Sequence, residues 1–95
     1  MNDPHLAIEK LKKLAGEAMT VSTEIEKAAI FGAVRAFAHD LDTADPGYLG
    51  EDIERARWSI CAILGYDITN EQPQEQLLSW ALSALGALED GFNRV

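Results

Sequence analysis

The sequence has few features that carry chemistry on their own. Its 95 residues include one cysteine and three prolines, and no apolar run reaches the ~20 residues of a transmembrane helix. One cysteine excludes an internal disulfide, and Cys61 lies among apolar residues, where we expect a buried, unreactive thiol. The first residues, MNDPHLAIEK, lack a secretory signal pattern. We therefore expect a cytoplasmic protein with a single helical domain, residues 1–95.

Basic residues are also scarce. Eight lysines and arginines stand against sixteen aspartates and glutamates, which gives a net charge of -8. Nucleic acid and anionic membranes repel such a chain, so we expect neither as a direct partner. The imbalance is greatest in the segment 40–54, which has no lysine or arginine and contains Asp40, Asp42, Asp45, Glu51, Asp52 and Glu54. A charged partner of this segment must be basic.

What the sequence does contain is a helical pattern of apolar residues. Apolar residues recur every three or four positions, which predicts four helices, at about 4–19, 23–41, 49–64 and 73–89. Four helices joined by short connections indicate an all-α fold, a compact and antiparallel bundle. The run QLLSWALSALGAL at 76–88 is the most apolar part of the chain. We expect the other helices to pack around it.

Polar residues and glycines indicate where the helices begin and end. Thr23 and Glu26 match a capping box at the start of the second helix. The segment 43–47, Thr-Ala-Asp-Pro-Gly, predicts the turn after it. Gly91 is expected to end the last helix, because glycine adopts the left-handed cap conformation easily. Gly86, inside that helix, is expected to make room for a neighbouring side chain.

Two patterns bear on metal binding. Asp40, Asp42 and Glu51 have the spacing of positions 1, 3 and 12 of a calcium-binding EF-hand loop. Position 5 is Ala44, which has no side-chain oxygen, and position 6, which needs glycine, is Asp45. We therefore expect a solvated acidic loop and no bound metal.

The second pattern is His39-Asp40, with His5 upstream and Asp67 downstream. It is similar to the His, His-Asp and Asp ligands of the helical metal-dependent phosphohydrolases, and implies a small metal-dependent hydrolase. Those domains are much longer. The glutamates that could act as acid or base mostly lie near predicted helix starts, where they are expected for dipole reasons alone; they are Glu24, Glu26, Glu51, Glu54, Glu71 and Glu75. We predict that the chain is not an enzyme and takes no cofactor, and keep the hydrolase as the least favoured alternative.

The chain has more aromatic side chains than one small core needs. The surplus residues are Phe31, Tyr48, Trp58, Tyr66 and Trp80. Aromatic side chains left outside a core are typical of a partner surface. The leading hypothesis is a non-enzymatic protein-binding module that docks on a basic surface of another protein. Its candidate partner-binding residues are Asp40, Asp42, Asp45, Tyr48, Glu51, Asp52, Glu54 and Trp58.

Carboxylates spread along such a surface can occupy a nucleic-acid channel of the partner, as phosphates do. In size, charge and class the chain resembles small phage-encoded inhibitors, including anti-CRISPR proteins, and acidic immunity proteins. The alternative is a homodimeric assembly module. It would associate through a face of the last helix made of Ser79, Trp80, Ser83 and Gly86.

Overall fold

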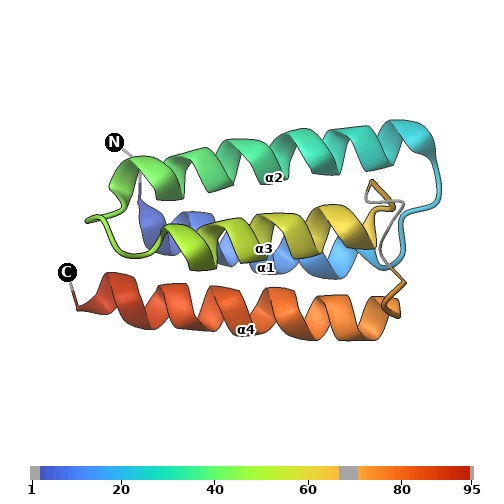
Figure 1. Ribbon diagram of the computed structural model, residues 1–95. Helices are drawn as coiled ribbons and strands as arrows, with labels where there is room; N and C mark the ends of the chain where they lie inside the picture. Colours follow the sequence, from blue (N-terminus) through green and yellow to red (C-terminus); the bar gives the residue numbers. More distant parts are fainter. Residues whose placement is uncertain (1–2, 67–70, 95) are drawn as a thin grey trace.

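The computed structural model describes residues 3–66 and 71–94, and in them the chain forms four helices and no strand. The helices are α1 (Pro4–Ala18), α2 (Glu24–Ala44), α3 (Gly50–Ile63) and α4 (Gln74–Asn93). Successive helices run in opposite directions, as in an up-down-up-down bundle (Figure 1). The predicted all-α bundle is confirmed. Within the described residues, no helix is both long and apolar enough to cross a bilayer.

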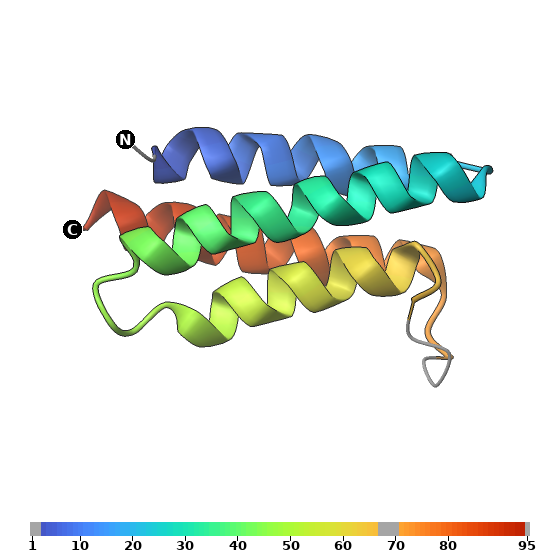
Figure 2. The same cartoon turned by 90° about the horizontal axis from the view of Figure 1, so that it is seen from above.

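The helices form a ring in which each one packs against the next and α4 closes back on α1 (Figures 1 and 2). The contact between α3 and α4 is the most extensive, and α1 also touches α3 across one diagonal. Across the other diagonal, the described residues of α2 and α4 make no close contact. The prediction that the other helices pack around α4 is therefore wrong, because α1 and α3 are the helices that contact all the others.

The core consists almost entirely of alanine and branched aliphatic residues. Fully burying one leucine or isoleucine side chain stabilises the fold by about 1.5–3 kcal/mol, and alanines let neighbouring helices approach closely. The larger side chains with almost no exposed surface are Ile8, Leu11, Val34, Leu41, Ile60, Leu77, Leu85 and Leu88. They come from all four helices and repeat at helical spacing, so the apolar periodicity of the sequence accounts for the core.

The start of α2 confirms the predicted cap. Thr23 Oγ1 accepts a hydrogen bond from the backbone N–H of Glu26 at 3.1 Å, and its own hydroxyl donates to Glu26 Oε1 at 2.7 Å. A capping oxygen of this kind satisfies one of the donors that a helix leaves unpaired at its start. The Glu26 side chain thus binds the Thr23 hydroxyl here.

The end of α2 lies three residues beyond the predicted position, at Ala44 in place of Leu41. Proline disfavours the helical conformation in the residue before it. Asp45, which precedes Pro46, is accordingly extended, with φ -62° and ψ 126°. The first residues of the predicted turn 43–47 are therefore helical, and the chain reverses after them.

The predicted helix stop at Gly91 is wrong, since α4 continues to Asn93. Gly91 is a buried helical residue packed against Leu49, and a Cβ atom there would lie 2.5 Å from Leu49 Cδ2. A Cβ at Gly86 would have no such neighbour within 4 Å. The room-making role expected of Gly86 therefore belongs to Gly91.

Changing each of these two glycines to alanine is expected to have opposite consequences. Gly86→Ala should raise the free energy of unfolding by about 0.5–1 kcal/mol, because alanine favours the helix. Gly91→Ala gains the same propensity but forces buried Leu49 to move, an overpacking cost of about 1–3 kcal/mol. Urea unfolding should place Gly91→Ala below Gly86→Ala by about 1–3 kcal/mol. Equal stability of the two variants would contradict the close contact with Leu49.

Candidate functional site

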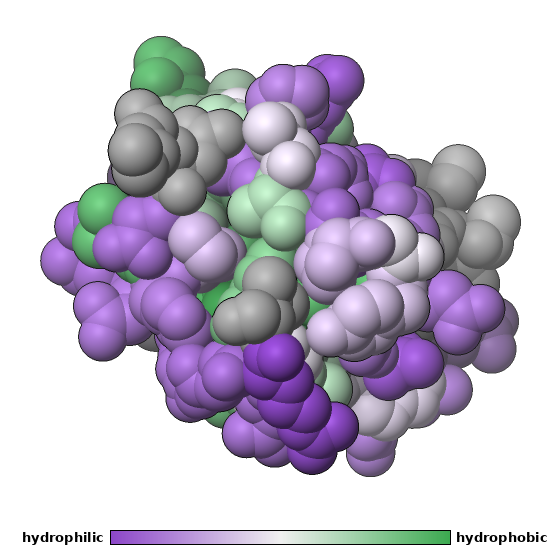
Figure 3. Space-filling view, turned by 90° about the vertical axis from the view of Figure 1, so that its left-hand side faces the viewer, coloured by the Kyte–Doolittle hydropathy of each residue, from purple (hydrophilic) through white to green (hydrophobic). Residues whose placement is uncertain are grey.

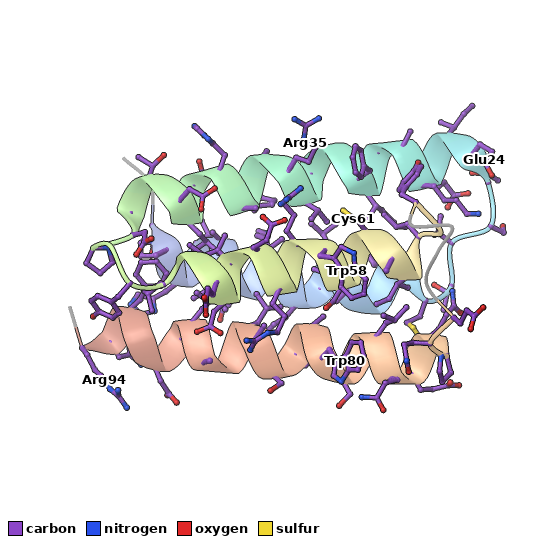
Figure 4. The ribbon with its side chains drawn as sticks, viewed as in Figure 1. Glu24, Arg35, Trp58, Cys61, Trp80 and Arg94 are labelled. Carbon is purple, nitrogen blue, oxygen red and sulfur yellow. The ribbon has the colours of Figure 1, made fainter. Side chains whose placement is uncertain are left out.

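One strip of α3 faces outward between α2 and α4. The opposite side of this helix is buried through Ile53, Ala56, Ser59, Ile60, Ala62 and Ile63. The strip carries Glu54, Arg57, Trp58 and Cys61, spaced i, i+3, i+4 and i+7 as on one face of a helix. Figure 4 shows Trp58 on this side of α3, with Trp80 beside it on α4 and Cys61 toward α2.

A groove of about 420 Å³ lies between α3 and α4. Trp58 and Trp80 stand in it with their ring centroids 6.4 Å apart and their planes 29° apart, as a stacked pair (Figure 4). Each of the two tryptophans is 36% exposed. The remaining lining residues are Arg55, Ser59 and Ser83. Two adjacent helices thus hold a large aromatic surface open to solvent.

Ser59 is the unusual member of this groove. The residue is completely buried, and its hydroxyl finds no hydrogen-bond partner among the described residues. A buried hydroxyl without a partner costs about 1–3 kcal/mol, so native structures contain few of them. The chain therefore places an unsatisfied polar group in a groove whose walls are aromatic.

A second groove, of about 410 Å³, lies between α2 and α3 and shares Trp58 with the first. The rings of Phe31 and Tyr66 meet in it with their centroids 4.8 Å apart, and the Arg35 guanidinium lies 5.8 Å from the centroid of the Phe31 ring. We call the surface formed by Phe31, Trp58, Tyr66 and Trp80 the aromatic face. These four residues belong to the surplus aromatic set. Trp58, Tyr66 and Trp80 are exposed, whereas Phe31 is partly buried and packs against the core.

The backbone after α3 fixes the position of Tyr66. Gly65 adopts φ 89°, a conformation that glycine reaches without a Cβ penalty. The N–H of Gly65 then bonds to the carbonyl of Ala62 at 3.0 Å, and the N–H of Tyr66 bonds to that of Cys61 at 3.2 Å. This pair of bonds is a Schellman motif, which ends the helix and turns Tyr66 toward Phe31.

Cys61 lines the second groove and is only partly buried, so the prediction of a buried thiol is correct in part. Burial raises the pKa of the Cys61 thiol, although Arg57 and Arg35 oppose the shift. A nucleophilic cysteine needs the opposite shift, since the thiolate is the reactive form. The thiol is therefore protonated at neutral pH and unreactive by this criterion.

Two of the predicted partner-binding carboxylates form ion pairs within α3. Asp52 Oδ1 accepts a hydrogen bond from Arg55 Nη1 at 3.2 Å, and Glu54 accepts hydrogen bonds from Arg57. The Arg57 guanidinium lowers the pKa of Glu54, and the hydrogen bond to Glu54 raises the pKa of Arg57. Exposed pairs three residues apart contribute at most about 1 kcal/mol each to stability. Their main effect here is to hold charges of both signs beside Trp58.

A third carboxylate, that of Asp45, is directed at the backbone of the α2–α3 connection. Asp45 Oδ1 accepts from the N–H of Gly47 at 2.9 Å and from the N–H of Leu49 at 3.0 Å. The hydrogen bond from Gly47 is the largest cause that lowers the pKa of Asp45. Burial opposes this shift, and the hydrogen bonds from Leu49 and Tyr48 add to it. The structure thus gives this predicted site residue a role in shaping the loop that precedes α3.

The other predicted site residues are spread over three elements. Asp40 is partly buried on α2, Glu51 is exposed in the first turn of α3, and Tyr48 is 63% exposed in the connection between them. Asp42 lines a polar hollow of about 250 Å³ between α2 and α3 with Arg35, Ala38, His39, Glu54 and Arg57. Seen from the end that carries this connection, the surface is mostly hydrophilic (Figure 3).

The two metal-binding patterns do not form sites in the described part of the chain. Because α2 continues to Ala44, Asp40 and Asp42 lie on a helix and not in an EF-hand loop. Across residues 3–66 and 71–94, no three His, Cys, Asp or Glu side chains come together in a group that could hold a metal. Asp67, part of the hydrolase pattern, lies outside the described residues.

Comparison with protein-family models, curated proteins and solved structures gives no match to this chain. The aromatic face and the grooves beside it therefore supply the functional argument. Sequence reasoning identified Trp58 but missed Ser59 and the pairing of Trp58 with Trp80. The signal for Ser59 was present, because this polar residue occupies a position in the buried stripe of α3 between Ala56 and Ile60.

Removing the Ser59 hydroxyl is expected to stabilise the protein. Ser59→Ala deletes an unsatisfied buried group and adds helix propensity, so the free energy of unfolding should rise by about 1–2 kcal/mol. Ser79→Ala, at an exposed position on α4, controls for propensity and should gain no more than about 0.5 kcal/mol. Urea unfolding measures both. A loss of stability in Ser59→Ala would show that the hydroxyl is satisfied in solution.

The Asp45 carboxylate is expected to make stability depend on pH in the acid range. Its pKa in the folded state lies below the ordinary value of 3.8, so its contribution is complete above pH 3.8 and is lost as pH falls through the lower folded-state pKa. Asp45→Asn keeps an acceptor oxygen but does not titrate. Thermal unfolding should show the wild type losing stability relative to this variant below about pH 4, by up to about 1 kcal/mol. If the wild type and Asp45→Asn lost stability in parallel as pH falls, the role assigned to the Asp45 carboxylate would be contradicted. The variant Glu9→Gln controls for the loss of one negative charge.

Proposed function

We propose that the chain is a non-enzymatic protein-binding module that docks on a basic surface of another protein through the aromatic face. The observation that supports this proposal most strongly is the stacked pair of Trp58 and Trp80, each 36% exposed in a surface groove. Tryptophan side chains that a partner can bury completely often dominate the energy of an interface. Trp58 lines both grooves, which makes it the central anchor.

Acidic residues beside the aromatic face indicate that the surface of the partner is positively charged. Asp42 and Glu54 line the polar hollow between α2 and α3, and Glu51 and Asp52 occupy the first turn of α3. The whole chain carries a net charge of -8. Charges at the rim of an interface speed association and select the partner more than they add affinity. The partner surface is therefore basic around an apolar centre.

The four described groups whose pKa is shifted are not suited to general acid or base catalysis. A general acid or base works best with a pKa near the working pH. The shifts of Asp45, Glu54 and Arg57 move these groups away from neutrality, and hydrogen bonds within one loop or one helix are their largest cause. Burial moves Cys61 away from neutrality as well. Each shift thus has a local structural cause.

The carboxylates also suit inhibition of a nucleic-acid-handling protein. Positions three apart on a helix, such as those of Glu51 and Glu54, are about 4.5 Å apart along its axis. Phosphates along one strand of duplex DNA rise by about 3.4 Å each, which is a comparable spacing. A rigid helix with carboxylates at these intervals can occupy a basic channel in place of nucleic acid, and so act as an inhibitor of the anti-CRISPR or immunity-protein kind.

The experiment is capture of partners from a lysate of the source cell, with quantitative mass spectrometry. The bait is the wild-type chain, and two variants lose the same two charges. Asp42→Asn with Glu51→Gln alters the proposed surface, whereas Glu9→Gln with Glu17→Gln alters exposed positions on α1. We expect a basic protein to be retained by the wild type and by the α1 variant, and to be depleted about tenfold with the surface variant.

Salt and nucleic acid provide the decisive second readout. The captured protein should elute as salt rises from 0.05 to about 0.5 M, because screening weakens contacts between exposed charges. Added duplex DNA should compete with the module if the partner uses the same channel for both. Retention that is equal for all three baits, or unchanged across the salt range, would overturn the proposal.

A further inference from the structure

We infer that the outer side of α4 binds the α4 of a second copy of the chain, with the two helices antiparallel. The outer side is the one turned away from the core, and it carries Ser79, Leu82, Ser83 and Gly86, none of which is buried. Trp80 lies on the flank of α4 toward α3, where it stacks on Trp58. The inference therefore goes beyond the proposed function and concerns a separate surface.

This outer side has no charge over most of its length. Residues 76–88 contain no aspartate, glutamate, lysine or arginine, although 25% of the chain is charged. Leu82 is 42% exposed there. A Cβ atom added at Gly86 would meet nothing within 4 Å, so no packing contact among the described residues explains a glycine that weakens the helix. The missing side chain leaves room for the close approach of another helix.

The charged residues at the two ends of α4 point to a second copy as the occupant. The ends of α4 carry Glu75, Glu89 and Asp90, and Arg94 is the C-cap. Glu89 binds Lys12 of α1. Across residues 3–66 and 71–94, Glu75, Asp90 and Arg94 form no ion pair. Figure 4 shows Arg94 at the end of α4, directed away from α3. Two antiparallel copies would place the acid of one start beside the base of the other end, whereas parallel copies would oppose like charges.

One antiparallel register matches the outer side to itself. Its two-fold axis passes between positions 84 and 85, with small residues at the centre and polar or charged residues at the ends. The opposed pairs, one member from each copy, are Ser83 with Gly86, Ser79 with Asp90, and Glu75 with Arg94. The Ser79 hydroxyl can donate to the Asp90 carboxylate. The register thus satisfies the end charges that α4 leaves unpaired in one chain.

The available area indicates a weak dimer. The 20 residues of α4 span about 30 Å, and a contact about 10 Å wide covers about 300 Å² on each copy. Stable dimers bury about 800 Å² per copy. The net charge of -8 also opposes association, although salt screens exposed charges more than about 8 Å apart. We therefore expect a dissociation constant of about 0.1 mM.

Sedimentation equilibrium of the full chain between about 0.01 and 1 mM measures this association. Gly86→Glu should abolish it, because the carboxylate would be buried where the two helices lie closest. Gly32→Glu is the matched control, since Gly32 is also a helical glycine at which an added Cβ meets nothing within 4 Å. This control should associate as the wild type does. Equal association of the two variants would contradict the inference.

Charge reversal at the ends of α4 tests the register. Glu75→Arg should weaken the dimer about tenfold, although it removes negative charge from the chain, because two end pairs are lost in each dimer. Arg94→Glu should weaken it as well, and the double variant should restore wild-type association. If net repulsion alone governed association, Glu75→Arg would strengthen the dimer, and the proposed register would be wrong.

Disulfide cross-linking tests the direction of the helices. In a Cys61→Ala background, Ser79→Cys should link to Asp90→Cys when the two variants are mixed at about 0.1 mM, and neither should link to itself. In the antiparallel register, position 79 of one copy lies about 16 Å along the axis from position 79 of the other, which is too far for a disulfide.

Two further outcomes would overturn the inference. One is a monomer throughout the concentration range, and the other is a disulfide that joins equal positions, as in a parallel pair. Capture of a basic protein from the lysate does not depend on the outer side of α4, so failure of that capture would count against the proposed function alone.

Discussion

Packing of α3 against the three other helices is the constraint on which the rest of the structure depends. α3 contacts α1, α2 and α4, and six of its fourteen residues are buried. The exposed side of α3 lies between α2 and α4, so it borders both grooves. This is why Trp58 lines the two grooves at once. A molecule that occupies either groove therefore touches a side chain of the other, and the aromatic face behaves as one surface.

Apolar packing, and not ion pairing, determines how the helices are arranged. Among the described residues, three ion pairs join positions three apart on one helix, and Lys12–Glu89 at 3.2 Å joins α1 to α4. Pairs within one helix do not specify which helices become neighbours. Exposed pairs also add little stability. The acidic surface can consequently be tuned for a partner with small effects on the fold.

The helices were predictable from sequence because their apolar periodicity is strong and local. Two errors at their ends have different physical origins. The end of α2 follows from Pro46, which acts on the residue before it and lets the helix reach Ala44. The continuation of α4 past Gly91 depends on Leu49, a residue far away in the sequence that needs the space a glycine leaves. Rules that consider only neighbouring positions in the sequence cannot predict the contact between Gly91 and Leu49.

The candidate site was predictable only in part. Composition identified the acidic segment 40–54 and the surplus of aromatic residues, since both are properties of the sequence itself. It could not show that Asp45 binds its own loop or that Asp52 and Glu54 pair within α3. The stacking of Trp58 on Trp80 arises from the pairing of α3 with α4, and the isolation of the Ser59 hydroxyl arises from packing.

The anchoring of α2 has a consequence for motion. This helix of 21 residues buries Ile30, Val34, Ala38 and Leu41, whereas α4, with 20 residues, buries seven. Local opening follows the least buried element, so the backbone amides of α2 should exchange with solvent deuterium sooner than those of α3 and α4. Detachment of α2 would widen the groove beside Phe31 while α1, α3 and α4 stay assembled. Among the four described helices, α2 therefore buries the fewest residues and is the least firmly anchored.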